Sequence, residues 1–194
     1  GLTPPWFPVC FMRWRMREKS PIQKFVGTVT NVIVVIALAW FLVHSFLTTE
    51  EISGHSMEPA ISASDLVLVD RLTYKFMKPK RMDVVIFQRS DATQNVKRVI
   101  GLPGETVQVK DGYTYINGKK LTSDIYGKEV MDEPGIAEEP VKLGKDEYFV
   151  LGDNRNDSTD SRDPDVGVLK KSDLMGRAWI RIYPFNKFGL LRHK

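Results

Sequence analysis

The chain has 194 residues, of which 42% are hydrophobic, and its 28 basic and 24 acidic residues give a formal net charge of +4. Part of the basic charge is concentrated before residue 25, and no basic stripe interleaved with aromatic residues follows, which argues against a nucleic-acid-binding protein. Cys10 is the single cysteine, so a disulfide within the chain is excluded.

The first predicted element is an uncharged apolar run over residues 25–47. As a helix it would be about 35 Å long, enough to cross the hydrocarbon core of a bilayer with some tilt. A cleavable signal peptide is the alternative, but its apolar part is only about 7–15 residues long. No small-x-small cleavage site follows the run cleanly. We therefore predict a retained transmembrane anchor.

The charges on either side of this run predict its orientation. Five basic residues precede it, namely Arg13, Arg15, Arg17, Lys19 and Lys24. Glu50 and Glu51 follow it. The positive-inside rule then predicts a cytoplasmic segment over residues 1–24, a single span over 25–47 and an extracytoplasmic domain over 48–194.

The remaining residues have the pattern of a mainly β protein. Short apolar runs rich in β-branched and aromatic residues predict strands over 65–70, 82–87, 96–100, 148–151 and 178–183. The dipeptides Asp111-Gly112 and Asn117-Gly118 predict two consecutive hairpins within 106–121. Residues 123–145 are acidic and aperiodic, which predicts an exposed loop or a small excursion. We expect an antiparallel β-sheet domain of the barrel or sandwich class.

Ser56 is the candidate nucleophile, in the stretch Ser53-Gly-His-Ser-Met-Glu-Pro59. A serine hydroxyl needs a base to take its proton, and histidine is the usual one. His44 lies in the apolar run and His193 next to the end of the sequence. His55 is the neighbour of Ser56, and successive side chains of extended backbone point to opposite faces. A Ser-His-Asp triad is therefore disfavoured.

Lys97 is the candidate base, because it alone among the lysines considered is flanked by apolar residues of a predicted strand. It accepts a proton only as a neutral amine, so its pKa must fall from an ordinary value of about 10.4, which burial can achieve. Strand alternation places Lys97 and Val99 on one face and Arg98 on the other. The local sequence is equally compatible with an edge-strand lysine that guards against aggregation.

Five sequence blocks follow the anchor, in the order Gly54-His-Ser-Met-Glu-Pro59, Asp65-Leu-Val-Leu-Val69, Arg81-Met-Asp-Val-Val-Ile-Phe87, Val96-Lys-Arg-Val-Ile-Gly-Leu-Pro-Gly-Glu105 and Gly152-Asp-Asn-Arg-Asn-Asp-Ser-Thr-Asp-Ser-Arg162. With these blocks in this order, the chain resembles a bacterial type I signal peptidase, a membrane-bound Ser/Lys protease that removes signal peptides from exported proteins. The single anchor and compact outer domain are more similar to the Gram-positive form than to the larger Gram-negative one.

The resemblance implies that Ser56 is the nucleophile and Lys97 the general base. It implies that Ser158 hydrogen-bonds the Lys97 amine and orients it. The backbone N–H of Ser56 is expected to stabilise the oxyanion. Some family members supply a second donor from a serine two residues before the nucleophile, where this chain has Gly54. A second backbone group or a water must then substitute.

The last block also implies two ion pairs, one between Asp160 and Arg162 and one between Asp153 and Arg98. Without the family, this block has the composition of a polar turn. A calcium loop fits poorly, because Arg155 occupies its third position. The resemblance places three residues near shallow substrate pockets: Ile52, Met57 and Ile61.

The resemblance implies a serine endopeptidase that cuts preprotein signal peptides after small residues at P1 and P3, with no cofactor and no metal. Its partners would be the signal peptides, the lipid bilayer and the secretion machinery, at the bacterial cytoplasmic membrane. A self-cleaving repressor-type protease is a rival, but the anchor argues against it. A non-catalytic partner in pilus or surface-protein assembly is the other, although both Ser56 and Lys97 are present.

Overall fold

The structure is a computed structural model, and it describes residues 20–88, 93–126 and 129–191. The chain divides into two compact units, Gly1–Leu42 and Val43–Lys194. Helix α1, Pro21–Phe46, fills the described part of the first unit and ends in the second.

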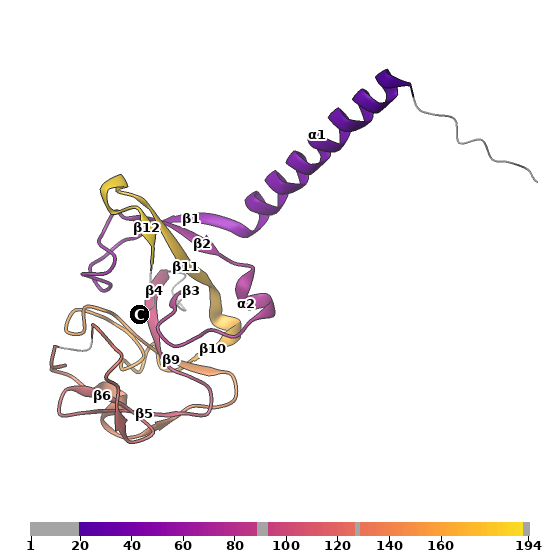
Figure 1. Ribbon diagram of the computed structural model, residues 1–194. Helices are drawn as coiled ribbons and strands as arrows, with labels where there is room; N and C mark the ends of the chain where they lie inside the picture. Colours follow the sequence, from indigo (N-terminus) through magenta and orange to yellow (C-terminus); the bar gives the residue numbers. More distant parts are fainter. Residues whose placement is uncertain (1–19, 89–92, 127–128, 192–194) are drawn as a thin grey trace, which may run out of the picture. The chain divides into compact units, whose positions relative to one another are not determined.

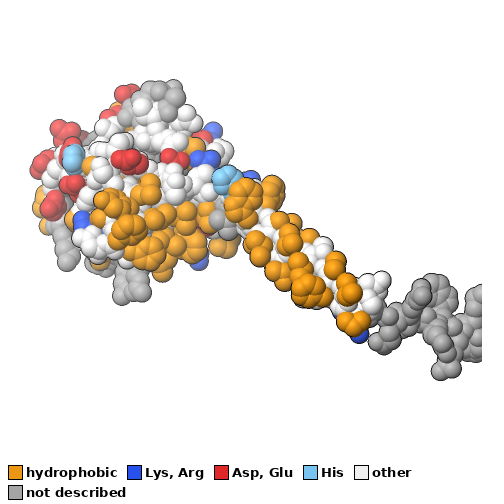
Figure 2. Space-filling view, turned by 90° about the horizontal axis from the view of Figure 1, so that it is seen from above, with side chains coloured by type: hydrophobic (Ala, Val, Ile, Leu, Met, Phe, Trp, Pro, Cys, Tyr) orange, Lys and Arg blue, Asp and Glu red, His pale blue; other side chains and the backbone are white. Residues whose placement is uncertain are grey.

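An 18-residue stretch of helix α1 has a mean hydropathy of 2.3, and the helix is long and apolar enough to cross a membrane. Figure 2 shows hydrophobic side chains along this helix, and most of its large apolar side chains are exposed. The hydroxyls of Thr28 and Thr30 donate to the carbonyls of Lys24 and Val26, so their polar groups are satisfied within the helix. The helix begins four residues before the predicted run, and Leu47 already belongs to the first strand.

The larger of two sheets has eight strands, all paired antiparallel (Figure 1). Its order is β1-β2-β11-β3-β4-β9-β10, with β12 paired to β11. The strands are β1 Leu47–Glu51, β2 Leu66–Asp70, β3 Val84–Gln88, β4 Gln94–Gly101, β9 Glu147–Leu151, β10 Leu169–Lys170, β11 Leu174–Tyr183 and β12 Gly189–Leu190. Each predicted strand coincides with one of them to within a few residues, so these predictions are confirmed.

The smaller sheet is also antiparallel, in the order β7-β6-β5-β8. Its strands are β5 Thr106–Lys110, β6 Tyr113–Ile116, β7 Lys119–Lys120 and β8 Val141–Lys142. The two predicted hairpins are present, since β5 pairs with β6 and β6 with β7. Asp111, Gly112, Asn117 and Gly118 all have positive φ, the conformation that tight two-residue turns require.

The remaining described elements are short: helix α2 (Thr73–Phe76) and the 3₁₀ turns η1 (Gly135–Glu138), η2 (Lys171–Asp173) and η3 (Phe185–Lys187). The predicted excursion over 123–145 contains η1 and β8. The fold is mainly antiparallel β, as predicted. Along the described strands, however, both sheets have two free ends and neither closes into a barrel.

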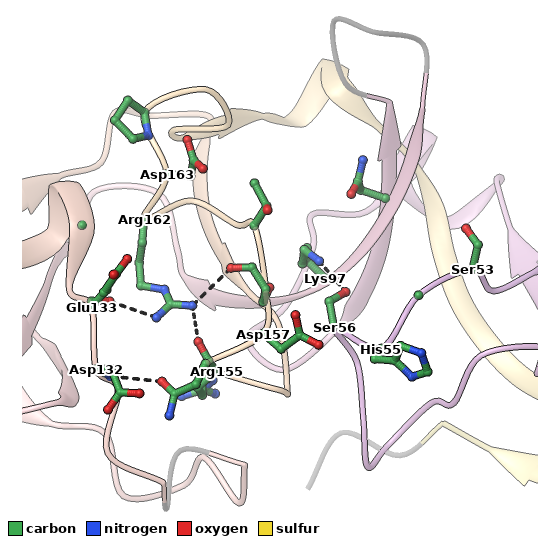
Figure 3. Close-up of a pocket in the computed structure, with 17 residues that line it drawn as sticks. Ser53, His55, Ser56, Lys97, Asp132, Glu133, Arg155, Asp157, Arg162 and Asp163 are labelled. Carbon is green, nitrogen blue, oxygen red and sulfur yellow. Dashed lines mark hydrogen bonds between the residues drawn. The ribbon is translucent and has the colours of Figure 1, made fainter.

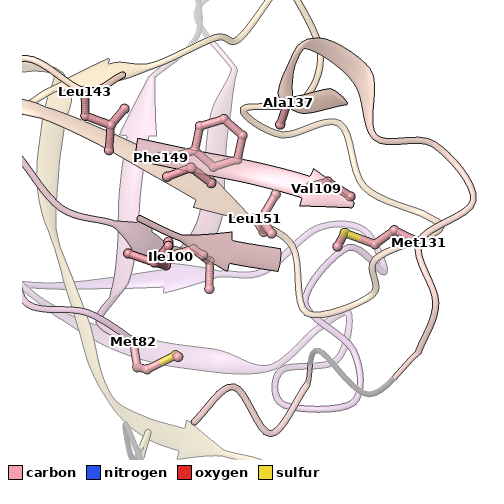
Figure 4. Close-up of a cluster of buried hydrophobic side chains, with 10 residues drawn as sticks. Met82, Ile100, Val109, Met131, Ala137, Leu143, Phe149 and Leu151 are labelled. Carbon is pink, nitrogen blue, oxygen red and sulfur yellow. The ribbon is translucent and has the colours of Figure 1, made fainter. Parts of the chain in front are cut away.

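Three apolar clusters form the core. The first joins the two sheets, because Ile100, Phe149 and Leu151 of the large sheet pack with Val107 and Val109 of the small one (Figure 4). The second lies under the residues around Ser56 and includes Ile52, Met57 and Ile61, together with apolar side chains of β2 and β3. The third packs Tyr74 against β3, β4 and β9. The segment around Ser56 therefore packs directly on the core of the large sheet.

Candidate active site

Lys97 lies on β4, which runs between β3 and β9 in the interior of the large sheet. It is paired with Val85 across the β3–β4 ladder. An interior strand has no free edge to guard, so the reading of Lys97 as an edge-strand lysine is wrong. The Lys97 side chain is 2% exposed, and such removal from water disfavours the charged ammonium.

Ser56 lies in a tight turn between β1 and β2. Gly54 has a φ of +94°, and the N–H of Glu58 donates to the carbonyl of His55 at 3.1 Å. A left-handed residue at position 54 favours glycine, which accounts for the absence of a side chain there. The turn rests on Met57, which is 1% exposed in the second core cluster.

The two candidate residues meet, although 41 positions separate them in the chain. Lys97 Nζ lies 2.6 Å from Ser56 Oγ and donates a hydrogen bond to it. Both line a cleft of about 740 Å³, and Figure 3 shows their side chains pointing toward one another. Residues 132, 133, 135, 155–159 and 162–164 also line this cleft. A nucleophile and a base within hydrogen-bond reach form the minimal arrangement for acyl transfer.

Ser158 does not make the expected hydrogen bond to Lys97. Its Oγ is buried and has no hydrogen-bond partner within the described residues. The side chain packs against Gly152, where an added Cβ would also lie only 2.6 Å from the carbonyl oxygen of Ser56. The absence of a side chain at Gly152 thus lets the loop of Ser158 approach the loop of Ser56.

The two expected ion pairs are present and buried. Arg98 donates two hydrogen bonds to Asp153, each 2.6 Å long, and Arg162 Nε lies 2.9 Å from Asp160 Oδ1. Burial opposes the charge of Arg98, but the hydrogen bonds and charge of Asp153 outweigh it and raise the Arg98 pKa. Asp160 also accepts a hydrogen bond from the backbone N–H of Gly152 at 3.0 Å. The Asp153–Arg98 pair ties the 152–162 loop to β4 of the sheet, and the contacts of Asp160 brace the loop internally.

Three further contacts at the site were not predicted. The backbone N–H of Asn154 donates to Ser56 O at 3.0 Å, and the Asn154 side chain donates to His55 O at 3.3 Å. Asn154 stood in a recognised block but had no role assigned to it. Arg155 forms a fully buried ion pair with Asp124. Asp124 lies in the acidic segment interpreted as an exposed loop, and no local signal distinguished it.

The three residues expected near substrate pockets are buried instead. Ile52, Met57 and Ile61 are 5%, 1% and 0% exposed and belong to the second core cluster. None of them lines the cleft of Ser56 and Lys97. In this arrangement they support the turn from below, and their contact with substrate stays a prediction.

His55, the chain neighbour of Ser56, is exposed, and its ring contacts Glu58. Its Nδ1 is 3.0 Å from Glu58 Oε1. The hydrogen bond and the negative charge of Glu58 raise the pKa of His55. Among the described residues, no group of three or more His, Cys, Asp or Glu side chains is arranged to hold a metal ion.

Comparison with known proteins gives consistent similarities. Residues 25–183 match the family described as "Signal peptidase, peptidase S26". A probable signal peptidase I-2 of Synechocystis sp. is 36% identical over 84% of this chain and 73% of its own length. A signal peptidase I of Leptolyngbya laminosa is 33% identical over 97% of this chain and 92% of its own. A crystal structure of a signal peptidase I from Enterococcus faecalis V583 aligns with a TM-score of 0.43 and 32% identity, covering 52% of this chain and 97% of that chain.

Proposed function

The chain belongs to the signal peptidase family, peptidase S26, and from this membership we propose that Ser56 and Lys97 form the catalytic dyad of a type I signal peptidase. The enzyme removes signal peptides from preproteins. The observation that carries the proposed dyad is the 2.6 Å contact between Lys97 Nζ and Ser56 Oγ, with the lysine buried. The comparisons give no support to a non-catalytic assembly partner.

The reaction follows from this contact. Neutral Lys97 takes the Ser56 proton as Oγ bonds to the scissile carbonyl carbon, and the backbone N–H of Ser56 stabilises the oxyanion. The Lys97 ammonium then gives that proton to the leaving amine, and the peptide C–N bond breaks. Lys97 next deprotonates a water that attacks the acyl-enzyme. The C–O bond to Ser56 breaks as the Lys97 ammonium returns that proton to Ser56 Oγ, and the new carboxyl end is released with Lys97 neutral again.

The supporting residues are proposed to position the loop beside Ser56 and Lys97 and not to take part in the proton transfer. Asp153–Arg98 and Asp160–Arg162 hold the loop that faces the dyad. Ser158 Oγ has no hydrogen-bond partner among the described residues, and we propose that it turns toward Lys97 when substrate is bound. Catalytic hydrogen bonds often tighten only in the substrate complex.

The proposed topology places residues 1–24 in the cytoplasm, a single span at α1 and the catalytic domain outside. Its support is the length and hydropathy of α1 and the basic residues before it. The proposed partners are preproteins, the lipid bilayer and the secretion machinery. Cleavage after small residues at P1 and P3 is proposed from family membership.

The test is to incubate the full chain in detergent with a preprotein and to identify the new N-terminus by mass spectrometry. Cleavage directly after a small residue at the end of the signal peptide is the expected result. The Ser56→Ala variant serves as the matched control and should leave the preprotein intact. Cleavage elsewhere, or equal cleavage by the control, would refute the proposed dyad.

A further inference from the structure

A second cleft of about 660 Å³ lies in the main unit between α2 and the β10–η2 segment. It shares no lining residue with the cleft of Ser56 and Lys97. Four of its lining residues are basic and one, Asp146, is acidic; the basic ones are Arg71, Lys75, Lys170 and Lys171. Such a lining favours an anionic ligand.

Arg71, one of the residues that line this cleft, has a buried hydrogen-bond donor without an acceptor among the described residues. Arg71 Nε is buried, and within the described part of the chain it has no hydrogen-bond partner. The same guanidinium contacts Glu50 only through Nη2, at a long 3.4 Å. Counting Glu50 with the lining residues still leaves two net positive charges. A buried donor left unsatisfied costs free energy, which an anionic oxygen in the cleft would recover.

The cleft adjoins the point where the chain leaves the apolar helix. Phe46 is the last residue of α1, and its carbonyl accepts a hydrogen bond from the Arg71 N–H at 3.1 Å. Lys75 Nζ lies 5.4 Å from the centroid of the Phe46 ring. All three residues belong to the same compact unit. If α1 spans a bilayer, these contacts keep the segment of Arg71 and Lys75 close to the membrane surface.

The segment that follows Lys75 has an interfacial character. Phe76 is 81% exposed and Met77 is 50% exposed, so two large apolar side chains stand in solvent next to the cleft. Lys78 and Lys80 follow them and are exposed. Apolar side chains bracketed by lysines are typical of segments that lie at a lipid headgroup layer.

We propose that this cleft binds the phosphodiester headgroup of an anionic phospholipid in the leaflet that α1 enters at its C-terminal end. Arg71, Lys75 and Lys171 contact the phosphate oxygens. Phe76 and Met77 enter the boundary between headgroups and acyl chains. This inference rests on the proposed membrane span, and it gives the catalytic unit a second attachment to the bilayer besides the covalent one.

The first test is native mass spectrometry of the full chain in neutral detergent, titrated with phosphatidylglycerol. A Lys75→Gln/Lys171→Gln variant should bind this lipid roughly thirtyfold more weakly, since each of the two lysines contributes about 1 kcal/mol near an anionic surface. The control is Lys110→Gln/Lys119→Gln, which removes the same charge from exposed positions of the smaller sheet. The control should bind like the unmodified chain.

Several outcomes would overturn the proposal. Equal losses in the two variants would mean general charge attraction, and equal affinity for phosphatidylcholine would mean that the headgroup charge is not recognised. Displacement of the lipid by inorganic phosphate alone would assign the cleft to a soluble anion. Cleavage of a soluble signal-sequence peptide by the same samples reports on the proposed function separately, and both lysine variants should retain it.

The second test measures how deeply position 76 inserts into the bilayer. Cys10→Ser removes the single cysteine, and Phe76→Cys then provides one site for a fluorophore on the full chain. In vesicles of phosphatidylglycerol with brominated acyl chains, the label at position 76 should be quenched. A label introduced by Lys119→Cys in the Cys10→Ser chain should not be quenched. Equal quenching at the two positions, or none at position 76, would contradict insertion of Phe76.

Discussion

At the scale of single residues, the proposed dyad needs Ser56 and Lys97 together, because in the proposal one supplies the attacking oxygen and the other receives its proton. Ser56→Ala and Lys97→Ala should each abolish cleavage while the full chain keeps its folded circular-dichroism spectrum. The double variant should be no slower than either single one, since groups that act as a unit have non-additive effects. Measurable turnover by a folded single variant would exclude the dyad.

The charge state of Lys97 predicts the pH dependence. Cleavage should rise on the alkaline side of neutrality, because only the neutral amine can accept the Ser56 proton. Lys97→Arg should be inactive at every usable pH, since a guanidinium stays protonated. The measurement is kcat against pH on a signal-sequence peptide.

His55 provides the control for this profile, because Glu58 raises its pKa and so moves its titration toward the same range. His55 loses its proton as the pH rises through that raised pKa, and removing the ring removes this titration. His55→Gln should therefore leave the alkaline rise in place. If the rise vanished in His55→Gln, it would belong to His55 and not to Lys97.

At the scale of elements, the loop over 152–162 meets the Ser56 turn at Gly152. An alanine Cβ there would lie 2.6 Å from the Ser56 carbonyl oxygen, so one of the two backbones must move. Gly152→Ala should lower kcat roughly a hundredfold, as expected for a nucleophile displaced by about 1 Å. Gly189→Ala is the matched control, because nothing lies within 4 Å of its added Cβ. Equal kcat values for the two variants would contradict the close approach.

The buried ion pair between Asp124 and Arg155 should contribute to the stability of the fold. Both side chains are buried, and Asp124→Asn leaves a buried guanidinium without its counter-charge. The free energy of unfolding should fall by about 3–5 kcal/mol. Urea denaturation of the full chain in detergent measures this fall. The control is Glu139→Gln, at an exposed position, which should change the free energy of unfolding by no more than about 0.5 kcal/mol. Similar losses of unfolding free energy in the two variants would mean that the Asp124–Arg155 pair is solvated.

At the scale of the whole molecule, every proposed catalytic group lies in the unit that begins at Val43. Removing residues 1–42 should leave kcat on a short soluble peptide nearly unchanged. It should raise the apparent KM for a bilayer-bound preprotein, because the anchor confines enzyme and substrate to one surface. Assays of the full and the shortened chain on both substrates measure this difference. Equal losses on the two substrates would show that the helix supports the site itself.

What the sequence determined by itself is the local structure and the family, together with the candidates for the reacting groups. The apolar run, the strands and the two Asp-Gly and Asn-Gly hairpins depend on neighbouring residues, so short-range patterns identify them. The family resemblance, carried by ordered blocks around Ser56 and Lys97, pointed to a signal peptidase, and the match over residues 25–183 confirms that family.

The tertiary structure alone decided which distant groups meet. The 2.6 Å contact of Lys97 with Ser56 depends on strand register and on an interior place for β4, which no local pattern states. Asp124 reaches Arg155 across 31 residues from a segment without periodicity. The orientation of Ser158 and the basic cleft between Arg71 and Lys171 arise in the same way. Such contacts depend on the packing of the whole chain, because burial and charge balance are properties of the assembled neighbourhood rather than of any segment.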